Sequence, residues 1–183
     1  LPYYLPQSRD DSVLVFESRF ESGNLRRAIQ ISDYDYNLVL STDFQTNAHT
    51  QWYYFSVANT RKNVEYHFKI VNMMKADSLY NWNEAVGVLI KEGEAATGKV
   101  GWHRSGSDIC YYVSSLKRKN GNYYNALSFT LKFERTYPVY ADDNDCVYIA
   151  HCYPYTYTQL QRYLRGLEND AVFETDLLAE RSA

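Results

Sequence analysis

The chain changes character along the stretch Asp145-Cys-Val-Tyr-Ile-Ala-His-Cys-Tyr-Pro-Tyr-Thr-Tyr-Thr-Gln-Leu160. Up to Ala150 the residues alternate as they do in a β-strand, and from Thr158 onward apolar residues recur at helical spacing. Between the two patterns lies a Tyr-Pro-Tyr-Thr-Tyr segment, residues 153–157, in which Pro154 restricts the backbone. The sequence therefore predicts that a β-rich unit ends here and that a helical unit begins.

The composition is that of an ordinary globular chain. Its 183 residues carry a formal net charge of −3, with 45% hydrophobic and 22% charged residues. Neither sign of charge dominates, so we expect no nucleic-acid partner. No apolar run approaches the roughly 20 residues of a membrane helix, so we expect no membrane partner. The 19 tyrosines raise the aromatic share to 16%, which favours β-structure.

Cysteine usage and the N-terminus indicate the compartment. The chain has three cysteines, an odd number, and no Asn-x-Ser/Thr sequon. Its first residues contain no basic segment followed by an apolar core, so they do not predict a signal peptide. We therefore expect reduced thiols and a cytoplasmic location.

Short strand-like segments separated by turn signals occupy residues 13–153, after an extended lead-in over residues 1–12. The clearest hairpin pairs residues 52–57 with 64–71 across the polar turn 59–63. Leu25, Ile29 and Ile31 are expected on one face of another strand. The remaining expected strands are 13–18, 36–40, 84–91, 108–113, 126–134 and 146–152. The sequence thus predicts an all-β fold, an antiparallel β-sandwich (or barrel) of about eight to nine strands.

Residues 154–183 are predicted to form the junction, a short helix and the truncated start of a further domain. Thr158 is the expected N-cap, and Gln161 completes a capping box three residues later. Gly166 is expected to weaken the end of this helix. One apolar face would be formed by Leu160, Tyr163, Leu164 and Leu167.

The sequence offers little chemistry that could support catalysis. No histidine (His49, His67, His103 or His151) is followed three positions later by the Glu of a carboxypeptidase zinc motif. Cys146, His151 and Cys152 are the nearest approach to a metal cluster, but strand alternation places His151 opposite both cysteines. His67 is expected to be an exposed histidine, while His49 and His103 are either structural or functional. Residues 142–145 indicate a solvated turn. We therefore expect no catalytic, cofactor-binding or metal-binding residue in this chain.

Basic residues gather in the expected turns. Lys117, Arg118 and Lys119 form one such group, and Arg61 and Lys62 form another. These charges are either simply solvated, as turn residues usually are, or they form a rim that attracts an acidic peptide.

Seven stretches carry further information. They are FESRFESGNLRRA (16–28), HTQWYYF (49–55), NTR (59–61), KADSLYN (75–81), GWHR (101–104), LSFT (127–130) and AHCYPYTYT (150–158). In this order and spacing they resemble the N-terminal domain of the cytosolic carboxypeptidase family. One stretch, residues 82–86, departs from the Gly-Met-Arg-Pro-like sequence usual in that family.

The resemblance implies an antiparallel β-sandwich ahead of a zinc carboxypeptidase domain, with the Tyr-Pro-Tyr-Thr segment leading into the first catalytic-domain helix. Family members remove glutamates from polyglutamylated proteins, above all tubulin. Their zinc ligands and general base lie beyond the matched residues, so this chain alone should be inactive, while the whole enzyme would bind zinc. The chain's own catalytic domain is then an expected partner, contacted through Tyr153, Pro154, Tyr155, Thr156 and Tyr157.

Two alternatives remain open from the sequence. The chain could be a free-standing β-sandwich module that binds acidic or cytoskeletal partners. It could also be the N-terminal domain of an inactive homologue that has lost its zinc ligands. A His-x-x-Glu motif after Ala183 would favour the enzyme, and zinc content would separate active from inactive homologues.

Overall fold

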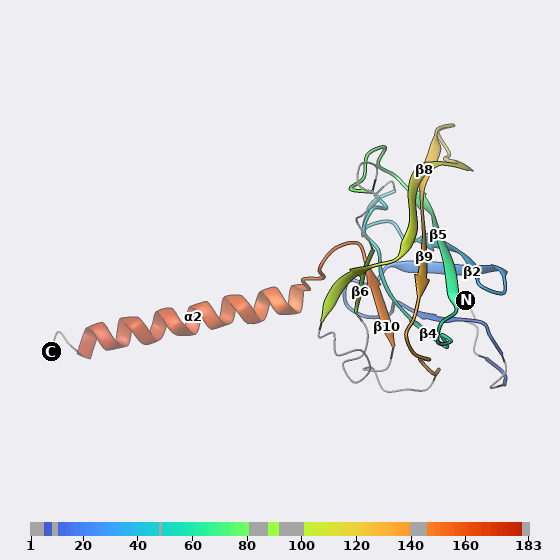
Figure 1. Cartoon of the computed structure of the whole chain (residues 1–183). Coiled ribbons are helices and arrows are strands. Elements are labelled where there is room, and N and C mark those ends of the chain that lie inside the picture. Colours follow the sequence, from blue (N-terminus) through green and yellow to red (C-terminus); the bar gives the residue numbers. More distant parts are fainter. Residues whose placement is uncertain are drawn as a thin grey trace. The chain divides into compact units, whose positions relative to one another are not determined.

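In the part of the chain that this computed structural model describes, ten β-strands form two five-stranded sheets, and one helix follows them (Figure 1). The structure describes residues 6–8, 11–47, 49–80, 88–91, 101–139 and 146–180. The chain divides into two compact units, residues 1–153 and residues 154–183. The first unit contains both sheets, and the second contains the helix.

The strand order is β1-β4-β10-β6-β7 in one sheet and β2-β3-β5-β9-β8 in the other. The first sheet contains β1 (Val15–Glu17), β4 (Tyr54–Ala58), β10 (Val147–Ala150), β6 (Val88–Lys91) and β7 (Trp102–Ser105). The second contains β2 (Leu25–Ser32), β3 (Asp35–Leu40), β5 (Glu65–Met73), β9 (Tyr123–Lys132) and β8 (Ser107–Lys117). The predicted all-β fold is confirmed. The parallel pair β3–β5 is an exception to the expected antiparallel pairing, because the chain visits the other sheet as β4 between these two strands.

The core lies between the sheets and is rich in aromatic rings. On β5, Tyr66, Phe68 and Ile70 are buried while Glu65 and His67 are exposed, as the alternation predicts. The same pattern buries Leu127, Phe129 and Leu131 on β9 and Phe133 just beyond it. The first sheet contributes Phe55, Val57, Val88, Ile90, Val147 and Ile149 to the same cluster. Each fully buried side chain of this size contributes about 1.5–3 kcal/mol to folding.

Buried tyrosines combine ring packing with hydrogen bonds. The Tyr36 hydroxyl accepts a hydrogen bond from the Leu14 amide at 2.9 Å, and the Tyr66 hydroxyl accepts one from the Arg61 amide at 2.9 Å. These bonds hold the loop backbone against the core, and a phenylalanine at either position could not form them because it has no hydroxyl.

The predicted hairpin of residues 52–57 with 64–71 is wrong. β4 pairs with β1 and β10, whereas β5 pairs with β3 and β9 in the opposite sheet. The polar turn instead crosses between the sheets, with Asn59 and Asn63 at positive φ (62° each) and Thr60 bridged to Tyr137. Both strands point apolar residues into one core, so their sequence pattern is the same whether they pair or face each other.

The apolar face expected on β2 is also wrong beyond Leu25. Leu25 and Ala28 pack against the core, whereas Ile29 and Ile31 are 41% and 60% exposed. The register to β3 shifts between Leu25 and Arg27, which is a β-bulge. One extra residue moves every following side chain to the opposite face.

The second unit contains α2 (Tyr157–Glu180), of 24 residues, which is longer than predicted. The predicted N-cap at Thr158 is wrong. The cap is Thr156, whose hydroxyl accepts a hydrogen bond from the Gln159 amide, while Gln159 Oε1 accepts one from the Thr156 amide. This is the expected capping box placed two residues earlier, and Gly166 lies inside the helix because one glycine costs only about 1 kcal/mol there. No helix in the described part of the chain combines the length and the apolar character that a membrane span requires.

Several predicted features lie outside the described residues. They are the strand residues 84–87, the family departure at 82–86 and the turn 142–145.

Candidate functional site

The segment that follows β5, residues 74–80, is fixed by hydrogen bonds from three parts of the first unit. The Lys75 carbonyl accepts hydrogen bonds from the Tyr111 hydroxyl at 2.6 Å and from the Asn125 side-chain amide at 2.7 Å. The Lys75 amide donates to Gln51 Oε1 at 3.3 Å. Because these partners belong to β8, β9 and the loop before β4, the segment is held in place although several of its side chains are exposed.

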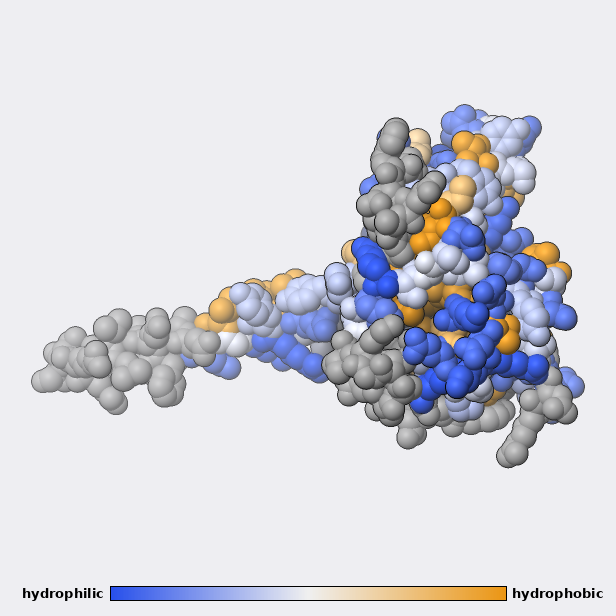
Figure 2. Space-filling model, viewed as in Figure 1, coloured by the Kyte–Doolittle hydropathy of each residue, from blue (hydrophilic) through white to orange (hydrophobic). Residues whose placement is uncertain are grey.

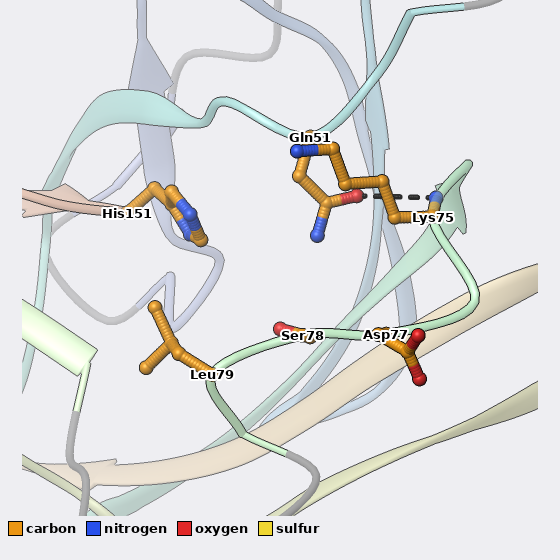
Figure 3. A pocket seen from close by; sticks show the side chains of 6 residues that line it. All are labelled: Gln51, Lys75, Asp77, Ser78, Leu79 and His151. Atoms are coloured by element: carbon orange, nitrogen blue, oxygen red, sulfur yellow. Dashed lines mark hydrogen bonds between the residues drawn. The ribbon is translucent and has the colours of Figure 1, made fainter.

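A pocket of about 350 Å³ lies beside this segment (Figure 3). That volume falls within the range of about 300–1,000 Å³ typical of ligand sites. The imidazole of His151 projects into the pocket from one side, and Gln51 and Lys75 lie on the opposite side. The lining residues are Gln51, Lys75, Asp77, Ser78, Leu79 and His151.

His151 follows β10 and packs on two buried tyrosines. Its ring centroid lies 5.4 Å from that of Tyr53 and 6.1 Å from that of Tyr80, both edge to face. Burial lowers the pKa of His151 below its usual value, and the positive charges of Arg104 and Lys75 lower it further. The imidazole is therefore neutral near neutral pH.

The two tyrosines under His151 are hydrogen-bonded to each other. Their hydroxyl oxygens lie 2.7 Å apart. Burial raises the pKa of Tyr53 well above its usual value and raises the pKa of Tyr80 as well. Both phenols therefore stay protonated and form a rigid, uncharged support for the His151 ring.

The described residues do not fit a zinc ion. Among them, no group of three or more His, Cys, Asp or Glu side chains lies together in a way that could hold a metal. Cys146 is half-buried and Cys152 is exposed, and neither forms a disulfide bond with another described residue. A hydrolytic zinc site needs three protein ligands, so no catalytic step can be assigned to a metal held by these residues.

The other histidines lie apart from the pocket lining. His67 is exposed, and its Nδ1 lies 2.9 Å from Thr130 Oγ1. His49 is exposed in its loop, where its carbonyl accepts a hydrogen bond from the Asp43 amide at 2.9 Å. His103 is half-buried on β7.

The basic group at the β8–β9 turn is not uniform. Lys117 and Lys119 are exposed. Arg118 is half-buried, and its guanidinium donates to the Met74 carbonyl at 2.8 Å and stacks over the Tyr124 ring at 5.2 Å. Both lysines face solvent, and the Lys117 ammonium lies over the Tyr123 ring at 5.5 Å. Arg118, which also donates to a backbone carbonyl, anchors the turn to the residue that precedes Lys75.

The residues of the junction differ in exposure. Tyr153, Tyr155 and Tyr157 are 63%, 61% and 66% exposed, whereas Pro154 and Thr156 are half-buried. Figure 2 shows apolar residues along one side of the helix that follows, where Leu160, Tyr163, Leu164 and Leu167 are all exposed.

The pocket was not predicted from the sequence. His151 was predicted only as a possible metal ligand, and no sequence pattern assigns a role to Gln51, Lys75, Ser78 or Leu79. The available signal was indirect, because all of these residues fall within three of the family-like stretches, 49–55, 75–81 and 150–158. Their convergence depends on tertiary contacts between segments distant in the chain.

Solved structures with a similar fold include two metallo-carboxypeptidases. A metallo-carboxypeptidase from Burkholderia cenocepacia superposes with a TM-score of 0.54 at 14% identity, covering 85% of this chain and 33% of that one. A metallo-carboxypeptidase from Pseudomonas aeruginosa gives a TM-score of 0.51 at 23% identity, covering 82% and 32%. At these identities the likeness establishes the fold alone, and that fold is one found as part of metallocarboxypeptidase structures.

Sequence comparison is more specific. The family model of the cytosolic carboxypeptidase N-terminal domain matches residues 16–151. The chain is 43% identical over 167 residues to mouse (Mus musculus) cytosolic carboxypeptidase 3, and 44% identical over 165 residues to zebrafish (Danio rerio) cytosolic carboxypeptidase 2. These alignments cover 91% and 90% of this chain but only 16% and 22% of the relatives. The chain therefore belongs to the cytosolic carboxypeptidases, a family of metallocarboxypeptidase hydrolases, and the matched residues are their N-terminal domain.

Proposed function

We propose that this chain is the non-catalytic N-terminal domain of a cytoplasmic zinc carboxypeptidase that removes glutamate from polyglutamylated or Glu-ending proteins such as tubulin. The observation that carries the proposal is the family match over residues 16–151. Parts of the parent protein outside this chain would supply the zinc ion, which polarises the scissile carbonyl in such enzymes. The domain itself would support the folding of the catalytic domain and control substrate access to it.

The proposed contact with the catalytic domain uses the junction. The exposed tyrosines Tyr153, Tyr155 and Tyr157 offer large ring surfaces with polar tips, which suit an interface that is partly wet. Pro154 and the capped start of α2 restrict the backbone that carries these three tyrosines. A stiff connection of this kind favours one orientation of the two domains.

The role in substrate access depends on exposed positive charge. Lys117 and Lys119 extend from the β8–β9 turn, and such charges attract an acidic chain before it reaches the catalytic centre. Arg118 is excluded from this role because its guanidinium is held by the Met74 carbonyl and the Tyr124 ring.

Glutamate release tests the proposed function. The full-length protein should release glutamate from a polyglutamylated peptide and lose this activity when zinc is chelated. The 183-residue chain should release none. A zinc-free, inactive full-length protein would favour the inactive homologue, and binding of acidic partners without any peptidase attached would favour a free-standing module.

Charge reversal tests the substrate-access role. Lys117→Glu combined with Lys119→Glu in the full-length enzyme should raise KM for polyglutamate by about two- to tenfold, with kcat little changed, because only the attraction of substrate is lost. Arg26→Glu with Arg27→Glu, two exposed cations on β2, is the matched control. Equal effects of the two pairs, or unchanged kinetics, would contradict the role.

A further inference from the structure

The pocket beside His151 offers positive charge and hydrogen-bond donors. Lys75 is exposed, makes no ion pair with any other described residue, and lies at the pocket with Gln51. The Asp77 carboxylate, which could have neutralised Lys75, points away from the centre of the pocket (Figure 3). Ser78 Oγ accepts a long hydrogen bond, 3.5 Å, from the Tyr80 amide, which leaves the hydroxyl proton for another acceptor.

The buried nitrogen of His151 determines what the ring presents to the pocket. Nδ1 is buried and has no hydrogen-bond partner in the described part of the chain. A buried N–H without an acceptor is rarer in proteins than a buried acceptor without a donor, so the neutral ring keeps its lone pair at Nδ1 and its proton at Nε2. His151 therefore presents an N–H donor at the ring nitrogen that remains accessible.

Leu79 adds an apolar side to this donor set. It lines the pocket and is 39% exposed. One ammonium, two neutral donors and a leucine complement a ligand with a single negative charge on a short alkyl stem. A doubly charged phosphate would leave one charge unmatched, and it has no stem to pack on Leu79.

We propose that this pocket binds a glutamate side chain of an acidic peptide, with the carboxylate accepting hydrogen bonds from His151 Nε2–H, the Lys75 ammonium and the Ser78 hydroxyl. The methylene groups would pack on Leu79. The choice of an acidic peptide rests on the proposed function, whereas the affinity for a carboxylate follows from the lining residues themselves. The pocket would then hold one residue of an acidic chain on the N-terminal domain itself.

A nuclear magnetic resonance titration of the 183-residue chain with tetraglutamate tests the pocket directly. Shifts are expected at Gln51, Lys75, Ser78 and His151, and tetraglutamine should produce none. Lys75→Met should weaken binding about tenfold, because it removes a charged hydrogen bond. Lys132→Met, an exposed lysine on β9, is the matched control and should leave binding unchanged.

The His151 ring provides a second readout that does not depend on a variant folding. Ring ¹⁵N shifts of the free chain should show a protonated Nε2 and an unprotonated Nδ1, and tetraglutamate should perturb Nε2 more than Nδ1. A protonated Nδ1 in the neutral ring, shifts confined to other surfaces, or equal weakening by Lys75→Met and Lys132→Met would overturn the proposal. If inorganic phosphate binds as tightly as tetraglutamate at the same residues, the proposal that the ligand is an acidic peptide is wrong.

These outcomes are separable from those of the proposed function. Full-length protein that releases glutamate while the pocket shows no shifts would refute the pocket alone. Shifts at the pocket together with a full-length protein that contains no zinc and releases no glutamate would refute the proposed activity alone.

Discussion

Replacing Asn72 by leucine should destabilise the first unit substantially. Asn72 is 8% exposed, and its side chain closes a two-bond ring with the backbone of Leu40. Asn72 Oδ1 accepts from the Leu40 amide at 2.8 Å, and Asn72 Nδ2 donates to the Leu40 carbonyl at 2.9 Å. The β3–β5 ladder pairs residues only as far as Leu38 with Ile70, so this side chain continues the ladder where backbone pairing stops.

The cost follows from the two backbone groups that would be left without partners. Each buried, unsatisfied group costs about 1–3 kcal/mol, which gives about 2–6 kcal/mol for the pair. Burial of the leucine methyl groups offsets about 1–2 kcal/mol of this. Taken at the middle of each range, these terms give an expected net loss of about 2–3 kcal/mol in the free energy of unfolding for Asn72→Leu.

Urea unfolding, followed by tryptophan fluorescence, measures this loss. With a denaturant slope of about 2 kcal/mol/M, the midpoint should fall by about 1–1.5 M. Asn37→Leu, on the half-buried outer face of β3, is the matched control and should change stability by less than about 0.5 kcal/mol. If the free energy of unfolding of Asn72→Leu lies within about 0.5 kcal/mol of that of the unchanged chain, the two Leu40 backbone groups do not depend on Asn72 for their hydrogen bonds.

A second variant separates hydrogen bonding from packing. Asn72→Asp keeps the size of the side chain and the acceptor for the Leu40 amide, but an ionised carboxylate cannot donate to the Leu40 carbonyl. Burial would raise the pKa of this carboxyl in the folded state, so its stability deficit should shrink as the pH falls and the carboxyl becomes a donor. A deficit that is independent of pH would contradict the assigned bonds.

Three further perturbations should have distinct outcomes. Thr156→Ala should cost about 1 kcal/mol of helix stability, seen as faster amide exchange in the first turn of α2, whereas Thr158→Ala, one residue inside the helix, should cost less. Gly23→Ala should lower the urea midpoint strongly, because its Cβ would collide with the Ser18 carbonyl oxygen. Gly166→Ala has open space and should stabilise the helix by about 0.5–1 kcal/mol. Because the pKa of Tyr53 is raised in the folded state, the protonated phenol contributes fully to the free energy of unfolding below about pH 10, and this contribution should be lost as the pH rises further. Tyr53→Phe should make the free energy of unfolding fall less steeply at alkaline pH.

Local patterns predicted well the residues that enter the core. Alternation on β5 and β9 identified Tyr66, Phe68, Ile70 and Phe129 as buried, because a strand turns every second side chain to the same face. The same reasoning failed on β2, where one bulge residue reversed the faces and exposed Ile29 and Ile31. A bulge depends on the partner strand, so the isolated strand sequence contains no signal for it.

The candidate site was predictable only in part. His151 was noticed because histidine can bind metals, but its structural role is to pack on Tyr53 and Tyr80 and to line a pocket. Lys75 and Gln51 have no spacing that links them to His151. Hydrogen bonds from β8 and β9 to the Lys75 carbonyl, rather than any local motif, fix the segment that forms one side of the pocket.

The sequence by itself determined that the chain is a β-rich unit followed by a helix, and it located the change at the Tyr-Pro-Tyr-Thr-Tyr segment, residues 153–157. Proline geometry, strand alternation and helix capping are local, so a linear pattern is enough to reveal them. Only the tertiary structure decided that β4 and β5 face each other across the core instead of pairing, and that residues 51, 75 and 151 meet at one pocket. Pairing and convergence depend on long-range packing, in which many partners satisfy the same local pattern and the whole core selects among them.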